Sequence, residues 1–241
     1  MKKYEERTYR SIIDKSRLLS RNVKIEESDL LISSEMNLSD EAFKSLAGHR
    51  HSLEVYIKKH PEFKESLVPL DEDSLAPPIV RDMLSKSKTC GVGPMAGVAG
   101  AVSEFVARDL LQLTDNLIIE NGGDIFLRTK YDVTVSVFAG ESPLSYKVNF
   151  IVKAKDTPLG ICTSSATVGP SLSFGKADAI CVISPSATLA DAAASAIGNR
   201  VKNKKDIRTA LEYGMNIPGV SGIIIILGNE MGVIGKIELV R

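Results

Sequence analysis

The sequence predicts an α+β fold of mainly antiparallel sheets with packed helices. Two observations lead to this prediction. Segments with strand patterns follow one another in runs, and segments with helical patterns are grouped between those runs. This order favours antiparallel sheets, because a doubly wound parallel sheet needs strands and helices in alternation. The chain has 241 residues, of which 44% are hydrophobic, enough to bury a substantial core.

The first half of the chain predicts more helix than strand. Residues 22–33 alternate around a polar "EESD" and indicate a hairpin. Residues 41–60 keep apolar side chains near helical spacing until Pro61, which disfavours further helix. A short helix is expected at 79–85, and a longer one at 95–112 after a glycine-rich entry.

The second half predicts mostly strands. Strand patterns occur at 116–120, 125–129, 132–140, 146–154, 159–164 and 178–184. Helices are expected at 188–199 and 204–216. Residues 222–240 indicate a closing hairpin around Asn229.

Charge and cysteine content exclude several classes of protein. Lys plus Arg and Asp plus Glu both number 30, so the formal net charge is zero. A nucleic-acid or membrane-surface partner is not expected, because both usually require a basic excess. The three cysteines form no CxxC or zinc pattern, which favours reduced thiols in a cytoplasmic protein.

The chain is expected to form one domain over residues 1–241. The segment before residue 50 supplies a hairpin and the start of a helix, and its layer in the fold is not fixed by the sequence. The N-terminus lacks the apolar run of a signal peptide, and "GIIIIL" is too short to cross a bilayer. Exposed sheet edges would allow a homodimer.

The segment "GVGPMA", residues 91–96, fits the letters of a dinucleotide-binding turn. That turn needs a strand before it, and the preceding "DMLSKSKT" is not one. Two interpretations remain for this region, including Gly97. Free N–H groups at the start of the following helix can bind an anion, or the small residues can serve close helix packing.

The segment "ENGGDI", residues 120–125, combines two glycines with flanking polar side chains. Gly122 and Gly123 permit positive φ and bring backbone close to a ligand. Three polar side chains surround the turn: Glu120, Asn121 and Asp124. The alternative is an ordinary hairpin turn, for which Asn and Gly are common.

A Ser-, Thr- and Gly-rich loop lies between two apolar strands at 162–178. Its first hydroxyls, Thr163, Ser164 and Ser165, suit a phosphate or the polar edge of a flavin, although a solvated loop has the same composition. All three histidines fall before residue 61, so the second half of the chain supplies no Ser-His-Asp triad.

Asp191 and Ser195 lie one helical turn apart in "TLADAAASAIGN". A carboxylate and a hydroxyl are oxygen ligands, which suit Mg²⁺. The alternative is that Asp191 caps the helix or lies in its first turn, where the helix dipole favours an acid.

Four segments in this order resemble the ApbE-like superfamily, whose founding members are FAD:protein FMN transferases. They are "GVGPMAGVAGAVSE", "ENGGDIFL", "TSSATVGPSLSFGKADA" and "LADAAASAIGN". The resemblance covers about residues 50–200 and is to a branch widespread in archaea and found in some bacteria. It implies a Mg²⁺-dependent enzyme that cleaves FAD and transfers FMN to Ser or Thr.

The resemblance also implies roles for residues of this chain. Asp191 and Ser195 match the metal-binding A-D-A-x-x-T-A helix, with Ser in place of Thr, and the Ala99 carbonyl matches the third metal ligand. It carries over the "GGD" turn as well, with Asp124 orienting the ligand or a metal-bound water. Thr163 and Ser164 match the family's "TSG" element.

Two departures affect the implied activity. Gly100 replaces a family lysine, and "GPSLSFGKAD" stands where the transferases carry H-I-I-D-P-x-T-G. Three hypotheses therefore stay open. The protein is a Mg²⁺-dependent enzyme acting on FAD, a non-catalytic protein binding FAD, FMN or another nucleotide, or an enzyme for an unrelated anionic small molecule.

Overall fold

An eight-stranded antiparallel sheet occupies the middle of the computed structural model, which describes residues 13, 15, 17–165 and 175–240. Its order is β1-β2-β3-β4-β7-β8-β9-β10, and every neighbouring pair is antiparallel. The strands are β1 (Leu19–Ile25), β2 (Ser28–Ser34), β3 (Leu117–Asn121), β4 (Asp124–Arg128), β7 (Leu159–Ser164), β8 (Ala179–Ser184), β9 (Gly222–Leu227) and β10 (Glu230–Gly235). The antiparallel prediction is confirmed.

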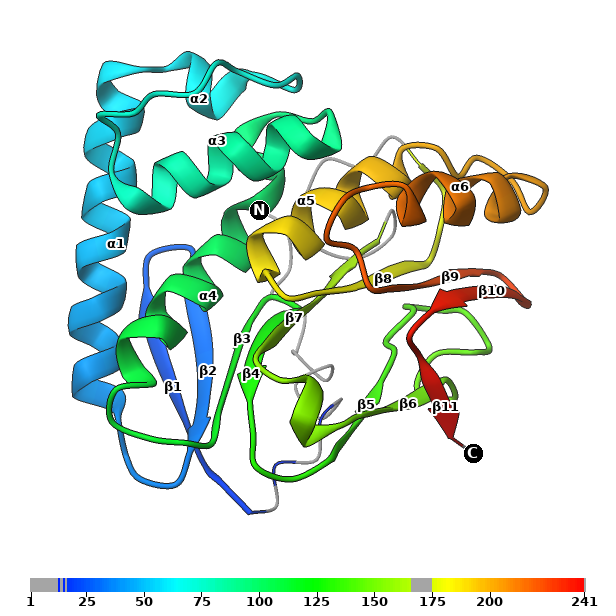
Figure 1. Cartoon of the computed structure of the whole chain (residues 1–241), viewed down its shortest axis with the longest axis horizontal. Coiled ribbons are helices and arrows are strands. Elements are labelled where there is room, and N and C mark those ends of the chain that lie inside the picture. The colour runs from blue at the N-terminus through cyan, green and yellow to red at the C-terminus, as the bar shows by residue number, and fades with distance from the viewer. Residues whose placement is uncertain (1–12, 14, 16, 166–174, 241) are drawn as a thin grey trace.

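A second sheet of three strands covers one face of the first (Figure 1). Its order is β11-β6-β5, and its strands are β5 (Val133–Ser136), β6 (Asn149–Val152) and β11 (Glu238–Val240). The predicted closing hairpin at 222–240 is correct only for β9 and β10. Gly235, at φ 88°, ends β10, and β11 then pairs with β6 in the other sheet.

The helices cover the opposite face of the large sheet (Figure 1). They are α1 (Ser39–Lys59), α2 (Glu62–Glu65), α3 (Pro78–Cys90), the 3₁₀ turn η2 (Pro94–Gly97), α4 (Val98–Leu110), α5 (Ala187–Gly198) and α6 (Asp206–Met215). A second 3₁₀ turn, η3 (Ala154–Asp156), follows β6.

Two of the predicted helices differ from the observed ones by more than two residues at one end. The helix expected at 79–85 runs on to Cys90, where left-handed Gly91 ends it. The helix expected at 95–112 is divided, because Pro94 opens a separate 3₁₀ turn before α4.

Alternation along the strands divides the interior into two cores. On β3, Ile119 faces the helices and Ile118 faces the small sheet. The two strand cysteines divide in the same way, since Cys162 belongs to the helical core and Cys181 to the core between the sheets. This alternation puts Asp124, two residues before helix-facing Phe126, on the side of the helices.

The N-terminal segment belongs to the large sheet. β2 pairs with β3, with Ile32 opposite Ile119, and α1 packs on β1 and α4. The sequence did not fix the layer to which the segment before residue 50 belongs. The structure shows that its two strands are part of the large sheet and that α1 packs on the face covered by the other helices.

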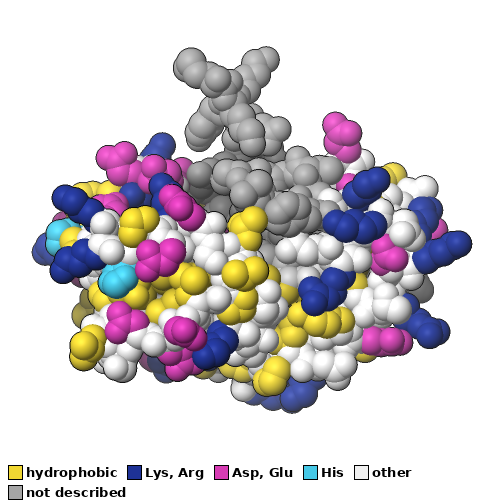
Figure 2. Space-filling view, turned by 90° about the horizontal axis from the view of Figure 1, so that it is seen from above, with side chains coloured by type: hydrophobic (Ala, Val, Ile, Leu, Met, Phe, Trp, Pro, Cys, Tyr) yellow, Lys and Arg dark blue, Asp and Glu magenta, His cyan; other side chains and the backbone are white. Residues whose placement is uncertain are grey.

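The surface carries charges of both signs, interspersed across the face shown in Figure 2. Within the described residues, no single helix is long and apolar enough to cross a membrane. One bent pair, α3 with η2–α4, meets the criterion of length and composition only when its two halves, inclined at 103°, are taken together.

Candidate functional site

Helix α5 exposes only two of its residues. Asp191 and Ser195, one turn apart, are partly exposed, and every other residue of α5 is buried. The helix is capped by Ser186, whose hydroxyl accepts the Leu189 N–H at 3.2 Å, and its first turn holds no acid. The alternative interpretation of Asp191 as a cap or first-turn acid is therefore wrong.

One peptide unit at the start of α4 joins the two motifs that flank it. The Gly100 N–H donates to Asp191 Oδ2 at 2.9 Å. The carbonyl of the same peptide unit, that of Ala99, accepts from Asn121 Nδ2 at 3.1 Å. This peptide is thus held from α5 on one side and from the β3–β4 turn on the other.

The close approach of α4 to α5 depends on glycine. A Cβ at Gly100 would lie 2.2 Å from the Ala187 carbonyl oxygen, and a Cβ at Gly97 would lie 2.9 Å from that of Thr188. Gly97 is itself buried. Of the two interpretations offered for this glycine-rich entry, close helix packing accounts for Gly97.

The β3–β4 turn is fixed by a side chain of its own. Glu120 Oε1 accepts the Gly123 N–H at 2.9 Å, and Gly122 and Gly123 have φ of 69° and 103°. Space around both glycines is open, so it is the positive φ that requires glycine. The hairpin interpretation explains the two glycines, and the turn also brings Asn121 and Asp124 toward α4 and α5.

Asp124 lies beneath that turn and is only 9% exposed. Burial raises the pKa of its carboxyl, and interactions with the Cys162 thiol and the Thr163 backbone oppose that rise. The Cys162 Sγ also lies 3.3 Å from the Ala187 carbonyl at the start of α5. The "ENGGDI" and "CTSS" segments are therefore neighbours, as adjacent strands β4 and β7 require.

The carboxyl groups of Asp124 and Asp191 influence one another through their charges. Burial raises the pKa of Asp191 to about 7, while hydrogen bonds from the Gly100 and Ala99 backbone oppose that rise. Burial and, next, the negative charge of Asp191 raise the pKa of Asp124 well above its usual value. Among the described residues, no basic side chain is one of the groups that act most strongly on either carboxyl.

These groups meet the chemical requirement of a hard cation. Two carboxylates, the Ser195 hydroxyl and the Ala99 carbonyl offer only oxygen, the ligand type that Mg²⁺ prefers. In the described part of the chain, no three His, Cys, Asp or Glu side chains gather as a metal site. A cation here would therefore need the hydroxyl and carbonyl oxygens, as well as water or ligand oxygens.

The remaining predicted residues lie around this corner. Ser164 ends β7, Ser165 follows it, and both are partly exposed, as is Thr163. The rest of the predicted Ser/Thr/Gly loop, from 166 to 174, lies outside the described residues. Beyond it, a Cβ at Gly175 would lie 2.0 Å from the Gly198 carbonyl, so the chain returns against the end of α5.

Three residues act at this site in ways that the sequence did not predict: Glu120, Cys162 and Gly100. The position of Cys162 could have been found from strand alternation, since Gly160 and Cys162 share the face of β7 that meets α5. Glu120 and Gly100 act through backbone hydrogen bonds, for which residue type gives no signal.

Comparison with known proteins gives consistent matches. A family model described as "AbpE bacteria" matches residues 10–238. A UPF0280 protein of Methanocaldococcus jannaschii is 44% identical over 199 residues, which cover 80% of this chain and 81% of that protein. A UPF0280 protein of Methanococcus vannielii is 39% identical over 226 residues, with coverages of 91% and 92%.

Two solved structures share the fold at low sequence identity. The ApbE protein of Thermotoga maritima superposes with a TM-score of 0.57 at 13% identity, covering 89% of this chain and 96% of its own. The flavinyl transferase ApbE of Pseudomonas stutzeri, in its apo form, gives a TM-score of 0.52 at 12% identity, with coverages of 90% and 94%. At these identities the likeness is one of fold.

Proposed function

The chain belongs to the family described as AbpE bacteria, and from this premise we propose that it is a Mg²⁺-dependent protein that binds FAD and acts on its phosphate-linked part. The observation that carries the proposal is the peptide unit at the start of α4, whose Gly100 N–H donates to Asp191 at 2.9 Å and whose Ala99 carbonyl accepts from Asn121 at 3.1 Å. Asp191 and the Ala99 carbonyl, two of the predicted metal ligands, therefore lie at the same peptide. The Pseudomonas stutzeri protein that shares the fold is a flavinyl transferase, which suggests the flavin.

The proposed metal ligands are Asp191, Ser195 and the Ala99 carbonyl. A bound Mg²⁺ would supply positive charge to the oxygens of a pyrophosphate. Asn121 holds the Ala99 carbonyl at 3.1 Å, so this oxygen has a fixed direction before any ligand arrives. A carbonyl oxygen has a second lone pair for a cation.

The other residues would bind and orient the ligand. Thr163, Ser164 and Ser165 offer hydroxyls at the end of β7 for phosphate or for the flavin's polar edge. The exposed Gly122 and its neighbour Gly123 leave the turn open for close approach. Asp124, held by the Thr163 backbone, would orient the ligand or a water molecule.

In the hydrolytic form of the reaction, water adds to one phosphorus of the FAD pyrophosphate and the phosphoanhydride bond breaks, giving FMN and AMP. In the transfer form, a Ser or Thr hydroxyl of a protein attacks the phosphorus of the FMN half in place of water. The hydroxyl loses its proton and stays bonded to FMN. Both forms release AMP, so AMP is the product to measure.

The test is a titration of purified protein with FAD, in Mg²⁺ and in EDTA. Flavin fluorescence reports binding, and chromatography reports AMP. Mg²⁺-dependent binding with AMP release supports the enzyme. Absence of both would overturn the proposal.

A second candidate function is non-catalytic binding of a flavin or another nucleotide. It is favoured by one observation, the absence of the H-I-I-D-P-x-T-G segment of the transferases. Mg²⁺-dependent binding of FAD that is recovered unchanged after long incubation would select this function. A ligand of a different class, identified by mass spectrometry of the purified protein, would instead select an enzyme for another anionic molecule.

A further inference from the structure

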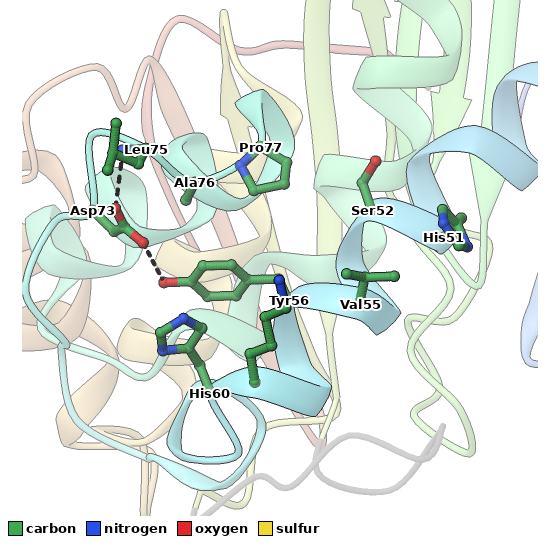
Figure 3. Close-up of a pocket in the computed structure, with 10 residues that line it drawn as sticks. His51, Ser52, Val55, Tyr56, His60, Asp73, Leu75, Ala76 and Pro77 are labelled. Atoms are coloured by element: carbon green, nitrogen blue, oxygen red, sulfur yellow. Dashed lines mark hydrogen bonds between the residues drawn. The ribbon is translucent and has the colours of Figure 1, made fainter.

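A cavity of about 370 Å³ lies between the C-terminal half of α1 and the loop that precedes α3 (Figure 3). It shares no residue with the site at Asp191. Its polar lining includes His51, Tyr56, Lys59, His60 and Asp73. Its volume falls at the low end of the range for small-molecule sites.

The wall of this cavity is held by hydrogen bonds around Asp73. The Tyr56 hydroxyl donates to Asp73 Oδ2 at 3.1 Å, and the Leu75 N–H donates to Asp73 Oδ1 at 2.9 Å (Figure 3). The Ala76 N–H donates to the Asp73 carbonyl at 3.2 Å. His60 stacks on Tyr56 with ring centroids 4.3 Å apart. The loop and helix are thus fixed to one another before a ligand binds.

Two apolar side chains at this cavity are exposed to solvent. Leu75 is 94% exposed and Val55 is 41% exposed, although the hydrogen bonds of Asp73 fix the loop that carries Leu75. Together with Pro77 they give the cavity an apolar side. Covering them with a ligand would remove apolar surface from water, which favours binding.

One cation that lines the cavity is available to an anion. Both carboxylate oxygens of Asp73 already accept hydrogen bonds from the cavity's own wall. Among the described residues, no hydrogen bond or ion pair engages the Lys59 ammonium or the His51 ring, whereas His60 Nδ1 lies 3.4 Å from Glu62. Lys59 is thus a lining cation that has no partner in the described part of the chain, and both carboxylate oxygens of Asp73 are already hydrogen-bonded.

We propose that this cavity binds a small organic anion, with its apolar body against Val55, Leu75 and Pro77 and its anionic group at Lys59. The proposal does not depend on flavin binding at Asp191, because the two sites share no residue and α3 packs between α1 and α5.

The test uses 2-naphthoate as the probe, with 2-naphthalenemethanol as a neutral probe of the same ring system and acetate as a charge without an apolar body. Calorimetry gives the dissociation constants. Proton–carbon NMR of the histidine rings locates binding, because His49 and His51 lie on α1, His60 follows its end, and only His51 and His60 line the cavity. His49, hydrogen-bonded to Asp109, is the internal control.

We expect 2-naphthoate to bind more tightly than either control probe and to shift the His51 and His60 signals saturably while His49 stays in place. Lys59→Gln should weaken binding about threefold to fivefold, the range of an exposed ion pair. Leu75→Ser should also weaken it. Lys44→Gln, at an exposed lysine of α1 outside the cavity, should leave it unchanged.

Equal affinity for naphthoate and the neutral alcohol would overturn the proposed anion. Three results would overturn the site. They are NMR shifts at His49 as large as those at His51 and His60, unchanged affinity for 2-naphthoate in Lys59→Gln, and failure of the protein to bind any of the probes. Sedimentation at the same concentrations identifies a competing occupant: a dimer that Leu75→Ser dissociates, without naphthoate binding, would assign this surface to a second copy of the chain.

Discussion

Helices α4 and α5 each place a carboxylate at the N-terminus of the other, and the two carboxylates have different surroundings. Glu104 of α4 accepts from the Ser186 hydroxyl at 2.9 Å and the Thr188 N–H at 3.1 Å, and it pairs with Arg108. Asp191 of α5 accepts the Gly100 N–H at 2.9 Å but has another carboxyl, Asp124, as its neighbour. Both acids satisfy free N–H groups at a helix start.

The difference separates a structural acid from a candidate binding acid. Glu104 is 2% exposed and has both hydrogen-bond donors and a cation, so its charge is compensated within the protein. Asp191 is partly exposed as a residue, but burial of its carboxyl raises its pKa to about 7, and no cation among the described residues is one of the groups that act most strongly on it. A carboxylate in the same geometric role thus stabilises the helix pair at the Glu104 end, and at the Asp191 end it belongs to the proposed cation site.

Removing Glu104 should produce the largest effect on stability. Glu104→Ala leaves the Thr188 N–H and the Ser186 hydroxyl without their acceptor, and the free energy of unfolding should fall by roughly 3 kcal/mol. Urea denaturation measures the loss. Arg108→Ala, which removes the half-exposed cation but keeps the cap, should cost less. An equal loss in both variants would mean that the ion pair, and not the cap, holds the helices.

Changing Asp191 should affect binding more than stability. Asp191→Asn keeps the size of the side chain and an oxygen for the Gly100 N–H, but it removes the charge that would attract Mg²⁺. The Mg²⁺-dependent affinity for FAD should fall at least about tenfold, or ~1.4 kcal/mol, while the unfolding free energy in EDTA should not fall.

Ser195 provides the matched control for that experiment. Ser195→Thr keeps the hydroxyl and should retain Mg²⁺-dependent binding, whereas Ser195→Ala should weaken it. Mg²⁺-dependent FAD binding that survives in Asp191→Asn would show that Asp191 serves only the start of α4, and the two carboxylates would then be equivalent.

The sequence predicted the antiparallel fold because strand runs and turn residues are local signals. It could not choose between the two interpretations of Asp191, because a helix-cap assignment depends on where the helix begins. Ser186 and Thr188 both resemble caps, and only the structure shows that the Ser186 hydroxyl accepts the Leu189 N–H. The break at Gly235 was missed because β10 and β11 both have strand patterns, although they join different sheets.

The site was partly predictable for a similar reason. The resemblance grouped Asp191, Ala99 and Asp124, which lie far apart in the chain and come from different elements. The residues that hold them, Asn121 on the Ala99 carbonyl and Glu120 on Gly123, act through contacts with backbone. Spacing along a sequence contains no information on such contacts, so Glu120 stood out only as a polar flank of the turn.

Asp82 offers the smallest but most specific test of the comparison, because it lies beside the Glu104 end. Burial raises the pKa of Asp82, the Glu104 charge also raises it, and a hydrogen bond with Thr188 opposes the rise. In the described part of the chain, Asp82 Oδ2 is buried without a hydrogen-bond partner. A carboxyl with a raised pKa in the folded state keeps its proton to higher pH, so its contribution to stability is lost as pH rises above the ordinary Asp value.

Asp82→Asn removes that titration with little change in shape. We expect the variant to be more stable than the native protein by about 1 kcal/mol at pH 7, with the difference shrinking toward pH 4, where protonation of the native carboxyl relieves its burial cost. Thermal unfolding from pH 4 to 8 measures this, with Asp71→Asn, at an exposed position, as the control. A loss of stability at pH 7 would contradict this expectation. It would mean that Arg108 and Lys86 together stabilise the charges of both Glu104 and Asp82.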